Sequence, residues 1–187
     1  MKDSGQIESL VEKCRQQDSR AQMEIYRLYY RAMFNISLRI VNGFEDAEDV
    51  MQEAFIKAFK NIKQYKKDST FGAWLKRIVI NESLGWVRKN KRNIFESLKE
   101  TEKDEEENMP EEDICHPEQI KAEKVLQAME KLKERYRIAL SLHLIEGYDY
   151  EEMQEILGLS NGNIRTLVSR AKNKLKQILE QEYGIYK

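Results

Sequence analysis

A strongly acidic segment divides this chain in two, and it limits the possible folds more than any other feature. Residues 93–120 carry eleven Asp and Glu against two basic residues, Lys99 and Lys103, a net charge of -9. They also include both prolines, Pro110 and Pro117. Mutual repulsion and a scarcity of apolar side chains predict an extended, mobile linker here. We therefore expect two separate domains, residues 1–92 and 117–187, joined by an acidic linker at residues 93–116.

The two parts that flank this segment are basic. The whole chain has 32 Lys and Arg against 33 Asp and Glu, a net charge of -1. Outside residues 93–120 the balance is 30 basic to 22 acidic residues, a net charge of +8. The near-neutral total therefore conceals two basic regions, as electrostatic attraction to nucleic-acid phosphates requires.

The sequence gives almost no support to an enzyme or a membrane protein. No apolar run approaches the roughly 20 residues of a membrane-spanning helix, and residues 1–5 have no apolar signal region. We expect a cytoplasmic protein with no membrane insertion. Cys14 and Cys115 are too isolated for a disulfide framework or a zinc site, even with His116 beside the latter. His143 lies in a helical apolar pattern, which favours packing. We predict no catalytic residue, metal or cofactor.

Apolar residues recur at helical spacing on both sides of the linker, and no segment alternates as a strand does. In the N-terminal domain the pattern predicts four helices. The first runs through Ile7, Leu10 and Val11, and the others begin near Asp18 or Ser19, at Glu45 or Asp46, and at Phe71. A turn at Asn42–Gly43 and a loop at residues 61–70 separate the last three. Four more helices are expected from Pro117 onward, since proline suits a first helical turn. The predicted fold is all-α.

The clearest local pattern is a helix-turn-helix between residues 146 and 175. Asp149 can cap a short first helix, with Glu152 completing a capping box, and Gly158 supplies the left-handed residue that ends it. Ser160 can cap the second helix. The expected buried positions are Met153, Ile156 and Leu157 on the first helix and Ile164, Val168, Ala171 and Leu175 on the second.

The second of these helices carries a polar face that can enter a major groove. Asn161, Arg165, Ser169 and Lys172 share this face, and Thr166 and Arg170 flank it. The candidate DNA-reading set is Asn161, Asn163, Arg165, Thr166, Ser169, Arg170 and Lys172. On this pattern alone, two ordinary packed helices joined by a tight turn remain the alternative.

The N-terminal domain offers two candidate surfaces. On the third helix, acidic and amide side chains lie opposite the apolar ones: Asp46, Glu48, Asp49, Gln52 and Glu53. The candidate docking residues among them are Asp46, Asp49, Gln52 and Glu53. They form either a solvated face favoured by the helix dipole or a docking surface for a basic partner. The second surface combines a basic, aromatic loop with the polar side of the fourth helix, a composition that binds single-stranded nucleic acid. Its candidates are Lys63, Tyr65, Lys66, Lys67, Arg77, Asn81 and Arg88.

Several stretches resemble bacterial sigma factors of the extracytoplasmic-function group. The segment Asp46–Phe55 (DAEDVMQEAF) resembles their region-2 signature, and Phe71–Asn81 (FGAWLKRIVIN) resembles the next part of that region. Leu132–Arg137, Glu146–Tyr148 and the helix-turn-helix through Ala171 resemble region 4. Two independent motif sets, in the right order and at about the right distance, are more specific than either alone.

The resemblance implies a dissociable subunit of RNA polymerase that selects promoters. Asp46, Asp49, Gln52 and Glu53 would then contact the clamp helices of core RNA polymerase. The loop and helix from about Lys63 would recognise and melt the minus-ten element, with Asn81 helping to hold a flipped base. The helix-turn-helix would read the minus-thirty-five element, and an anti-sigma factor is the implied regulator. Leu167 stands where the family often has a polar or basic residue on the recognition helix.

Two other classes of protein remain possible from the residues. A helix-turn-helix regulator that works without polymerase would explain the C-terminal domain, but not the acidic helix or the basic loop. A helical scaffold or sequestering protein would explain neither the loop nor the ordered polar face. We favour a promoter-specificity factor.

Overall fold

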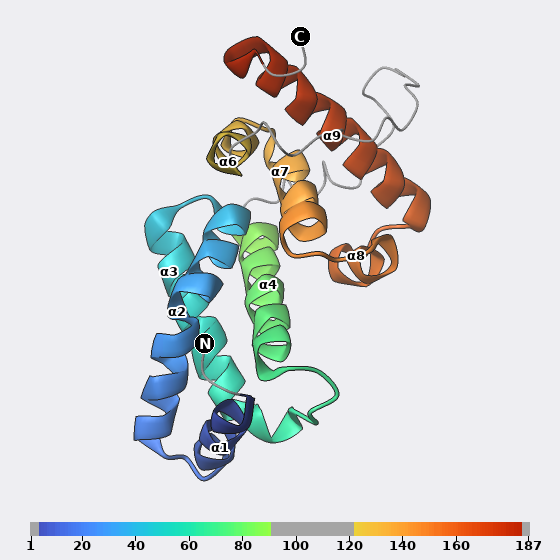
Figure 1. The fold of residues 1–187 in the computed structure, drawn as a ribbon. Helices are drawn as coiled ribbons and strands as arrows, with labels where there is room; N and C mark the ends of the chain where they lie inside the picture. Colours follow the sequence, from blue (N-terminus) through green and yellow to red (C-terminus); the bar gives the residue numbers. More distant parts are fainter. Residues whose placement is uncertain (1–3, 91–121, 185–187) are drawn as a thin grey trace. The chain divides into compact units, whose positions relative to one another are not determined.

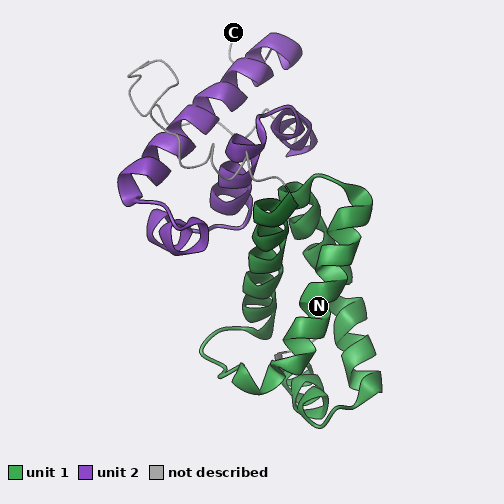
Figure 2. Cartoon of the chain, turned by 180° about the vertical axis from the view of Figure 1, so that it is seen from behind, with its two compact units in different colours: residues 1–90 green, residues 91–187 purple. Residues whose placement is uncertain are grey.

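The computed structural model describes residues 4–90 and 122–184, and every regular element in these two ranges is a helix. The chain divides into two compact units, residues 1–90 and 91–187 (Figure 2). The predicted acidic linker and the predicted domain start at Pro117 lie outside the described residues. The all-α prediction is confirmed in the described part.

Unit 1 is a bundle of three long helices with a shorter one packed against it (Figure 1). The long helices α2 (Ser19–Val41), α3 (Phe44–Lys60) and α4 (Phe71–Asn90) contact one another. Helix α1 (Ser4–Arg15) packs against α2 and against a short 3-10 turn, η1 (Ile62–Gln64). Fully buried side chains of the three long helices fill the centre, among them Ile25, Ile40, Met51, Leu75 and Ile80.

The helix ends in unit 1 follow from local capping. The carboxylate of Asp18 accepts hydrogen bonds from the backbone N–H groups of Arg20, at 2.8 Å, and Ala21, at 3.1 Å. Asn42 ends α2 in the left-handed region at φ 59°. Helix α3 begins at Phe44, slightly earlier than predicted, and the ring of Phe44 lies against that of Phe34 with 5.1 Å between centroids.

In unit 2 the other described α-helices all pack against the last one. Helix α9 (Asn161–Tyr183) contacts α6 (Ala122–Glu130), α7 (Glu134–Leu140) and α8 (Tyr150–Leu157) (Figure 1). Helix α7 continues into a π-helical turn, η3 (Ser141–Ile145), which the periodicity did not predict. Four α-helices in this described range agree with the number expected.

The predicted helix-turn-helix is confirmed in detail. Asp149 and Glu152 form the reciprocal capping box of α8, and Gly158 ends that helix at φ 68°. Ser160 caps α9 through the backbone N–H of Asn163. All seven apolar positions expected to be buried are buried. Short-range hydrogen bonds thus fix the turn between α8 and α9.

Candidate polymerase and nucleic-acid interfaces

The polar side of α3 is an open acidic surface. Asp46, Asp49, Gln52 and Glu53 are all exposed, while Ala47, Val50, Met51 and Ala54 bury the other side of the helix. Within the described ranges none of the four polar side chains forms a hydrogen bond or an ion pair. Their carboxylates and amide are therefore available to an external partner. We refer to these four residues as the acidic face.

An apolar side chain extends this surface, and the sequence analysis missed it. Ile56 leaves 54% of its surface exposed, and it follows Gln52 by four residues and Glu53 by three, so it belongs to the same stripe of α3. An exposed isoleucine beside these carboxylates would add apolar area to any contact that this face makes. Helical periodicity places Ile56 between the buried stripe and the acidic stripe of α3, and this spacing could have predicted its exposure.

The basic loop and α4 present most of the predicted nucleic-acid residues together on unit 1. Lys63, Lys66 and Lys67 are exposed in or near the loop before α4, and Asn81 and Arg88 are exposed on α4. Arg77 is half-buried one turn before Asn81. The Nζ of Lys67 lies 3.3 Å from Oε2 of Glu8 on α1. Arg77, Asn81 and Arg88 recur at helical spacing on one side of α4, a combination of amide and cationic side chains that suits a phosphate backbone and an unpaired base.

Tyr65, a member of the predicted nucleic-acid set, has its ring buried in this structure. Tyr65 is only 6% exposed. Its ring packs on Phe71 and Trp74, with 5.5 Å between centroids in each pair, and its hydroxyl donates to the carbonyl oxygen of Ser69 at 2.8 Å. An aromatic residue next to lysines looks exposed in the sequence, but a loop that folds back over the start of α4 buries it. Tyr65 therefore shapes the loop from within.

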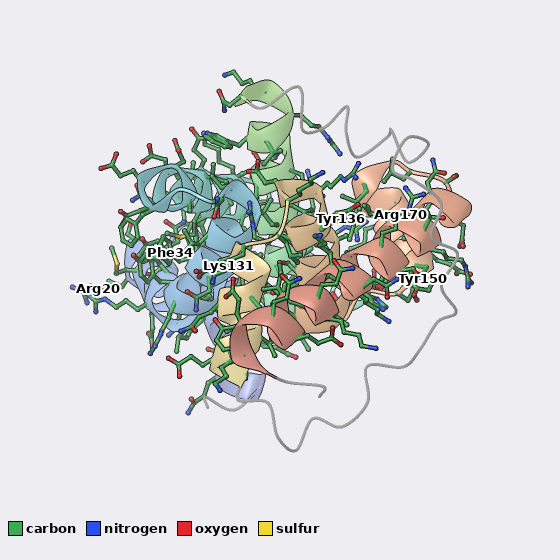
Figure 3. All side chains as sticks on the ribbon, turned by 90° about the horizontal axis from the view of Figure 1, so that it is seen from above. Arg20, Phe34, Lys131, Tyr136, Tyr150 and Arg170 are labelled. Carbon is green, nitrogen blue, oxygen red and sulfur yellow. The ribbon has the colours of Figure 1, made fainter. Side chains whose placement is uncertain are left out.

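In unit 2 the polar residues of α9 begin at its capped end. Arg165 and Thr166 are exposed, and Asn161, Asn163, Ser169, Arg170 and Lys172 are half-buried. Figure 3 shows Arg170 on this helix and Tyr150 at the start of α8. Thr166 Oγ1 donates to the carbonyl oxygen of Gly162 at 2.9 Å, which still leaves the hydroxyl oxygen able to accept. The predicted set thus lies on one amphipathic helix beside the turn.

Arg165 is held in place by residues that the sequence analysis did not select. Its Nε donates to Oδ1 of Asn161 at 2.8 Å, and its guanidinium carbon lies 5.0 Å from the centre of the Tyr150 ring. His143 stacks on the same tyrosine at 5.0 Å and 19°, and its Nδ1 lies 3.0 Å from the carbonyl oxygen of Tyr148. Arg165 is thereby oriented before any ligand is bound. No local sequence signal joins His143 to Arg165, because the two meet only through the fold.

Leu167, which stands where the family often has a polar or basic residue, is a core residue of unit 2. Leu167 is 2% exposed and packs in the core with Ile164, Val168 and Ala171. The buried stripe of α9 is wider than predicted because the helix contacts α6, α7 and α8 rather than a single neighbour. A leucine is therefore required at this position for packing, and it does not bear on which bases are read.

Two features of the described ranges concern metal and thiol chemistry. No group of three or more His, Cys, Asp and Glu is arranged there to hold a metal ion. Burial raises the pKa of the Cys14 thiol to about 11, which keeps it protonated and poorly nucleophilic. Cys115 and His116 lie outside the described residues. No described helix is long and apolar enough to cross a membrane.

Comparison with known proteins gives two family matches along the chain. Residues 25–93 match the model of Sigma-70 region 2, and residues 122–175 match that of Sigma-70, region 4. RNA polymerase sigma factor YlaC of Bacillus subtilis is 30% identical over 159 residues, which cover 82% of this chain and 89% of that protein. The ECF RNA polymerase sigma-E factor of Escherichia coli is 28% identical over 186 residues, 92% and 95% of the two chains.

A solved structure gives the same result. The sigma factor RpoE in complex with the anti-sigma factor NepR, from Bartonella quintana, is 26% identical in sequence. It superposes with a TM-score of 0.56 over 86% of this chain and 97% of that one.

Proposed function

This chain belongs to the sigma-70 family of RNA polymerase sigma factors, in its extracytoplasmic-function group, and we propose that its two units divide the work of promoter recognition. It binds core RNA polymerase for promoter-specific initiation of transcription, as this family does. Unit 1 would dock on the polymerase and melt the minus-ten element, and unit 2 would read the minus-thirty-five element. The observation that carries this division is an exposed acidic face in the region-2 match together with a capped helix-turn-helix in the region-4 match.

The acidic face is the proposed docking surface on the clamp helices of the polymerase. Asp46, Asp49, Gln52 and Glu53 are exposed and make no bond within the described ranges, so docking breaks no internal contact. Ile56 beside them supplies apolar area. Charge complementarity of this kind sets the rate and orientation of association.

The minus-ten element is the proposed ligand of the loop and of α4. Lys63, Lys66, Lys67, Arg77 and Arg88 would neutralise phosphates of the non-template strand. Asn81 would hydrogen-bond an extruded base, and capture of that base would offset an unstacking cost of a few kcal/mol. Tyr65 supports the loop and makes no base contact in this proposal.

The minus-thirty-five element is the proposed ligand of α9. Arg165 is exposed and pre-oriented, and it would give a bidentate contact to a guanine in the major groove. Asn161, Asn163, Thr166, Ser169, Arg170 and Lys172 would complete the contacts to bases and phosphates. Because these positions flank the capped turn, the α9 N-terminus would face the groove.

Membership of this family suggests how the protein is regulated and where in the cell it acts. RpoE of Bartonella quintana was solved with the anti-sigma factor NepR, which supports an anti-sigma factor as a regulator here too. We propose that the protein acts in the cytoplasm, where polymerase and promoter DNA meet. It would make and break no covalent bond, since RNA synthesis belongs to the core enzyme.

The docking proposal is tested by measuring the affinity of the labelled protein for cognate core RNA polymerase. The variant combines Asp49→Ala, Gln52→Ala and Glu53→Ala. Removal of two charges and an amide from a protein–protein contact is expected to weaken binding by about tenfold or more. A matched control combines Glu151→Ala, Gln154→Ala and Glu155→Ala, which removes two carboxylates and one amide at the same spacing on α8.

The control is expected to bind core polymerase as the wild type does. Equal losses in the two variants would place the contact elsewhere. No binding by folded wild-type protein would overturn the proposal, and a regulator that binds duplex DNA without polymerase would then account better for α8 and α9.

A further inference from the structure

Two side chains of α1 reach the loop that precedes α4. Arg15 Nη2 donates to the carbonyl oxygen of Tyr65 at 2.6 Å, across 50 residues of sequence. Glu8 Oε2 lies 3.3 Å from the Nζ of Lys67, across 59 residues. Both contacts come from a helix that lies outside the region-2 family match, which begins at residue 25. Helix α1 therefore does more than cover the core of unit 1.

The loop needs such support because its backbone is unusual. Lys67 has φ 65°, in the left-handed region that a residue with a Cβ adopts at a cost. The Tyr65 hydroxyl donates a hydrogen bond to the carbonyl oxygen of Ser69. This bond closes residues 65–69 of the loop around the Tyr65 ring. The bond from Arg15 fixes the backbone at Tyr65, where the chain leaves η1. These contacts together determine where Lys66 and Lys67 are presented.

The two contacts made by α1 differ in how easily another group can replace one of the partners. The Arg15 side chain is only 28% exposed, and its bond to the Tyr65 carbonyl is charge-assisted and partly buried. The side chains of Lys67 and Glu8 are 49% and 55% exposed, so water and salt screen their ion pair. A DNA phosphate can therefore replace Glu8 beside Lys67, while Arg15 keeps its hold on the backbone.

We propose that α1 is the positioning element of the minus-ten loop: Arg15 fixes the loop backbone, and Glu8 occupies Lys67 until a phosphate of the melted strand displaces it. This rests on the proposed function of the loop. It assigns Arg15 and Glu8 opposite effects on DNA affinity, because one prepares the loop for DNA and the other competes with DNA.

The test measures the affinity of holoenzyme for a short, fluorescein-labelled single-stranded DNA, selected from a randomised pool with wild-type holoenzyme. Arg15→Ala is expected to weaken binding by about tenfold, since it removes a charge-assisted bond that orders the loop. Glu8→Gln is expected to tighten binding by about two- to threefold at low salt, since it removes the competing carboxylate. Lys13→Ala, which removes an exposed charge from the same helix, serves as the control and should change little.

The opposite signs separate positioning from general damage to α1, which would weaken binding in both variants. In a Lys67→Ala background the gain from Glu8→Gln should disappear, because the two residues act as a pair. Affinity for core polymerase should be unchanged in all variants, which also shows that they are folded.

Unchanged affinity with Arg15→Ala, or weaker binding with Glu8→Gln, would overturn the inference. If Asn81→Ala weakens binding while both α1 variants match the wild type, the inference alone fails. If Asn81→Ala and Lys66→Ala also leave binding unchanged, the proposed minus-ten function fails with it.

Discussion

Arg165 is the side chain of α9 whose geometry is most restricted before DNA binding. Its Nε is engaged by Asn161 and its guanidinium lies over Tyr150, so its two Nη groups remain for a ligand. Ordering a long side chain in advance reduces the entropy lost on binding. We therefore regard Tyr150 and Asn161 as contributors to promoter affinity through Arg165, even where neither touches a base.

Leu167 and Thr166 are neighbours on α9, but substitution should affect stability at the first position and DNA binding at the second. Leu167→Ala leaves a cavity in the core and should lower the free energy of unfolding by about 3 kcal/mol. Thr166→Ala alters an exposed position and should change it by less than about 0.5 kcal/mol, while weakening duplex binding. Urea unfolding followed by circular dichroism measures the stability of both variants.

Tryptophan fluorescence adds a check on this measurement. Trp74 and Trp86 are the only tryptophans of the chain, and both lie in unit 1. If the urea midpoint of a variant shifts when followed by circular dichroism but not when followed by fluorescence, the destabilised part is therefore unit 2. Unchanged stability in Leu167→Ala, with altered selectivity for the minus-thirty-five sequence, would contradict the core assignment.

The burial of two residues could not be predicted from the local sequence. Tyr65 was chosen as a nucleic-acid contact because it lies among lysines in a loop, and Leu167 was noted only as a departure from the family's polar residue on the recognition helix. Burial is decided by which helices pack together, and that depends on contacts far apart in the chain. The loop folds over α4 in one case, and α9 meets three helices in the other. Local pattern carries no information on either event.

At the scale of the elements, sequence signals worked where the determining contacts are short. The starts of α2, α8 and α9 were predicted from capping residues whose hydrogen bonds span two or three positions. The π-helical turn η3 and the tether from α1 were not predicted, because both depend on tertiary packing. The exposure of the acidic face was predicted, since helical periodicity alone separates it from the core.

The cap of α2 gives a pH-dependent prediction. Backbone hydrogen bonds from Ala21 and Arg20 hold the pKa of Asp18 below its ordinary value of 3.8. A carboxylate with a lowered pKa stabilises the fold above its unfolded pKa, and this contribution is lost as the pH falls through the folded value. Asparagine caps helices about as well without titrating. Below about pH 4 the wild type should therefore lose stability faster than Asp18→Asn.

The measurement is the urea midpoint of unit 1 from tryptophan fluorescence, over the range from about pH 6 to pH 3. Asp68→Asn, in the exposed loop before α4, is the control and should follow the wild type. Parallel curves for the wild type and Asp18→Asn would show that the cap contributes nothing specific to the acid response.

At the scale of the whole molecule, charge is sorted along the sequence. The segment at residues 93–120 carries a net charge of -9, and the rest of the chain carries +8. The order of the amino acids alone predicts this division, and the acidic segment separates two basic parts of the chain that each carry one proposed DNA surface. The acidic face of α3 is an exception within the basic part, in keeping with its proposed role in docking on the polymerase.

The most direct test of the central claim is transcription in vitro with cognate core RNA polymerase on fragmented genomic DNA, with and without this protein. We predict new transcripts whose 5′ ends lie downstream of shared minus-ten and minus-thirty-five sequences. The variant that combines Asp49→Ala, Gln52→Ala and Glu53→Ala should yield far fewer of them. An unchanged set of start sites, with the folded protein present in excess over core polymerase, would contradict the account.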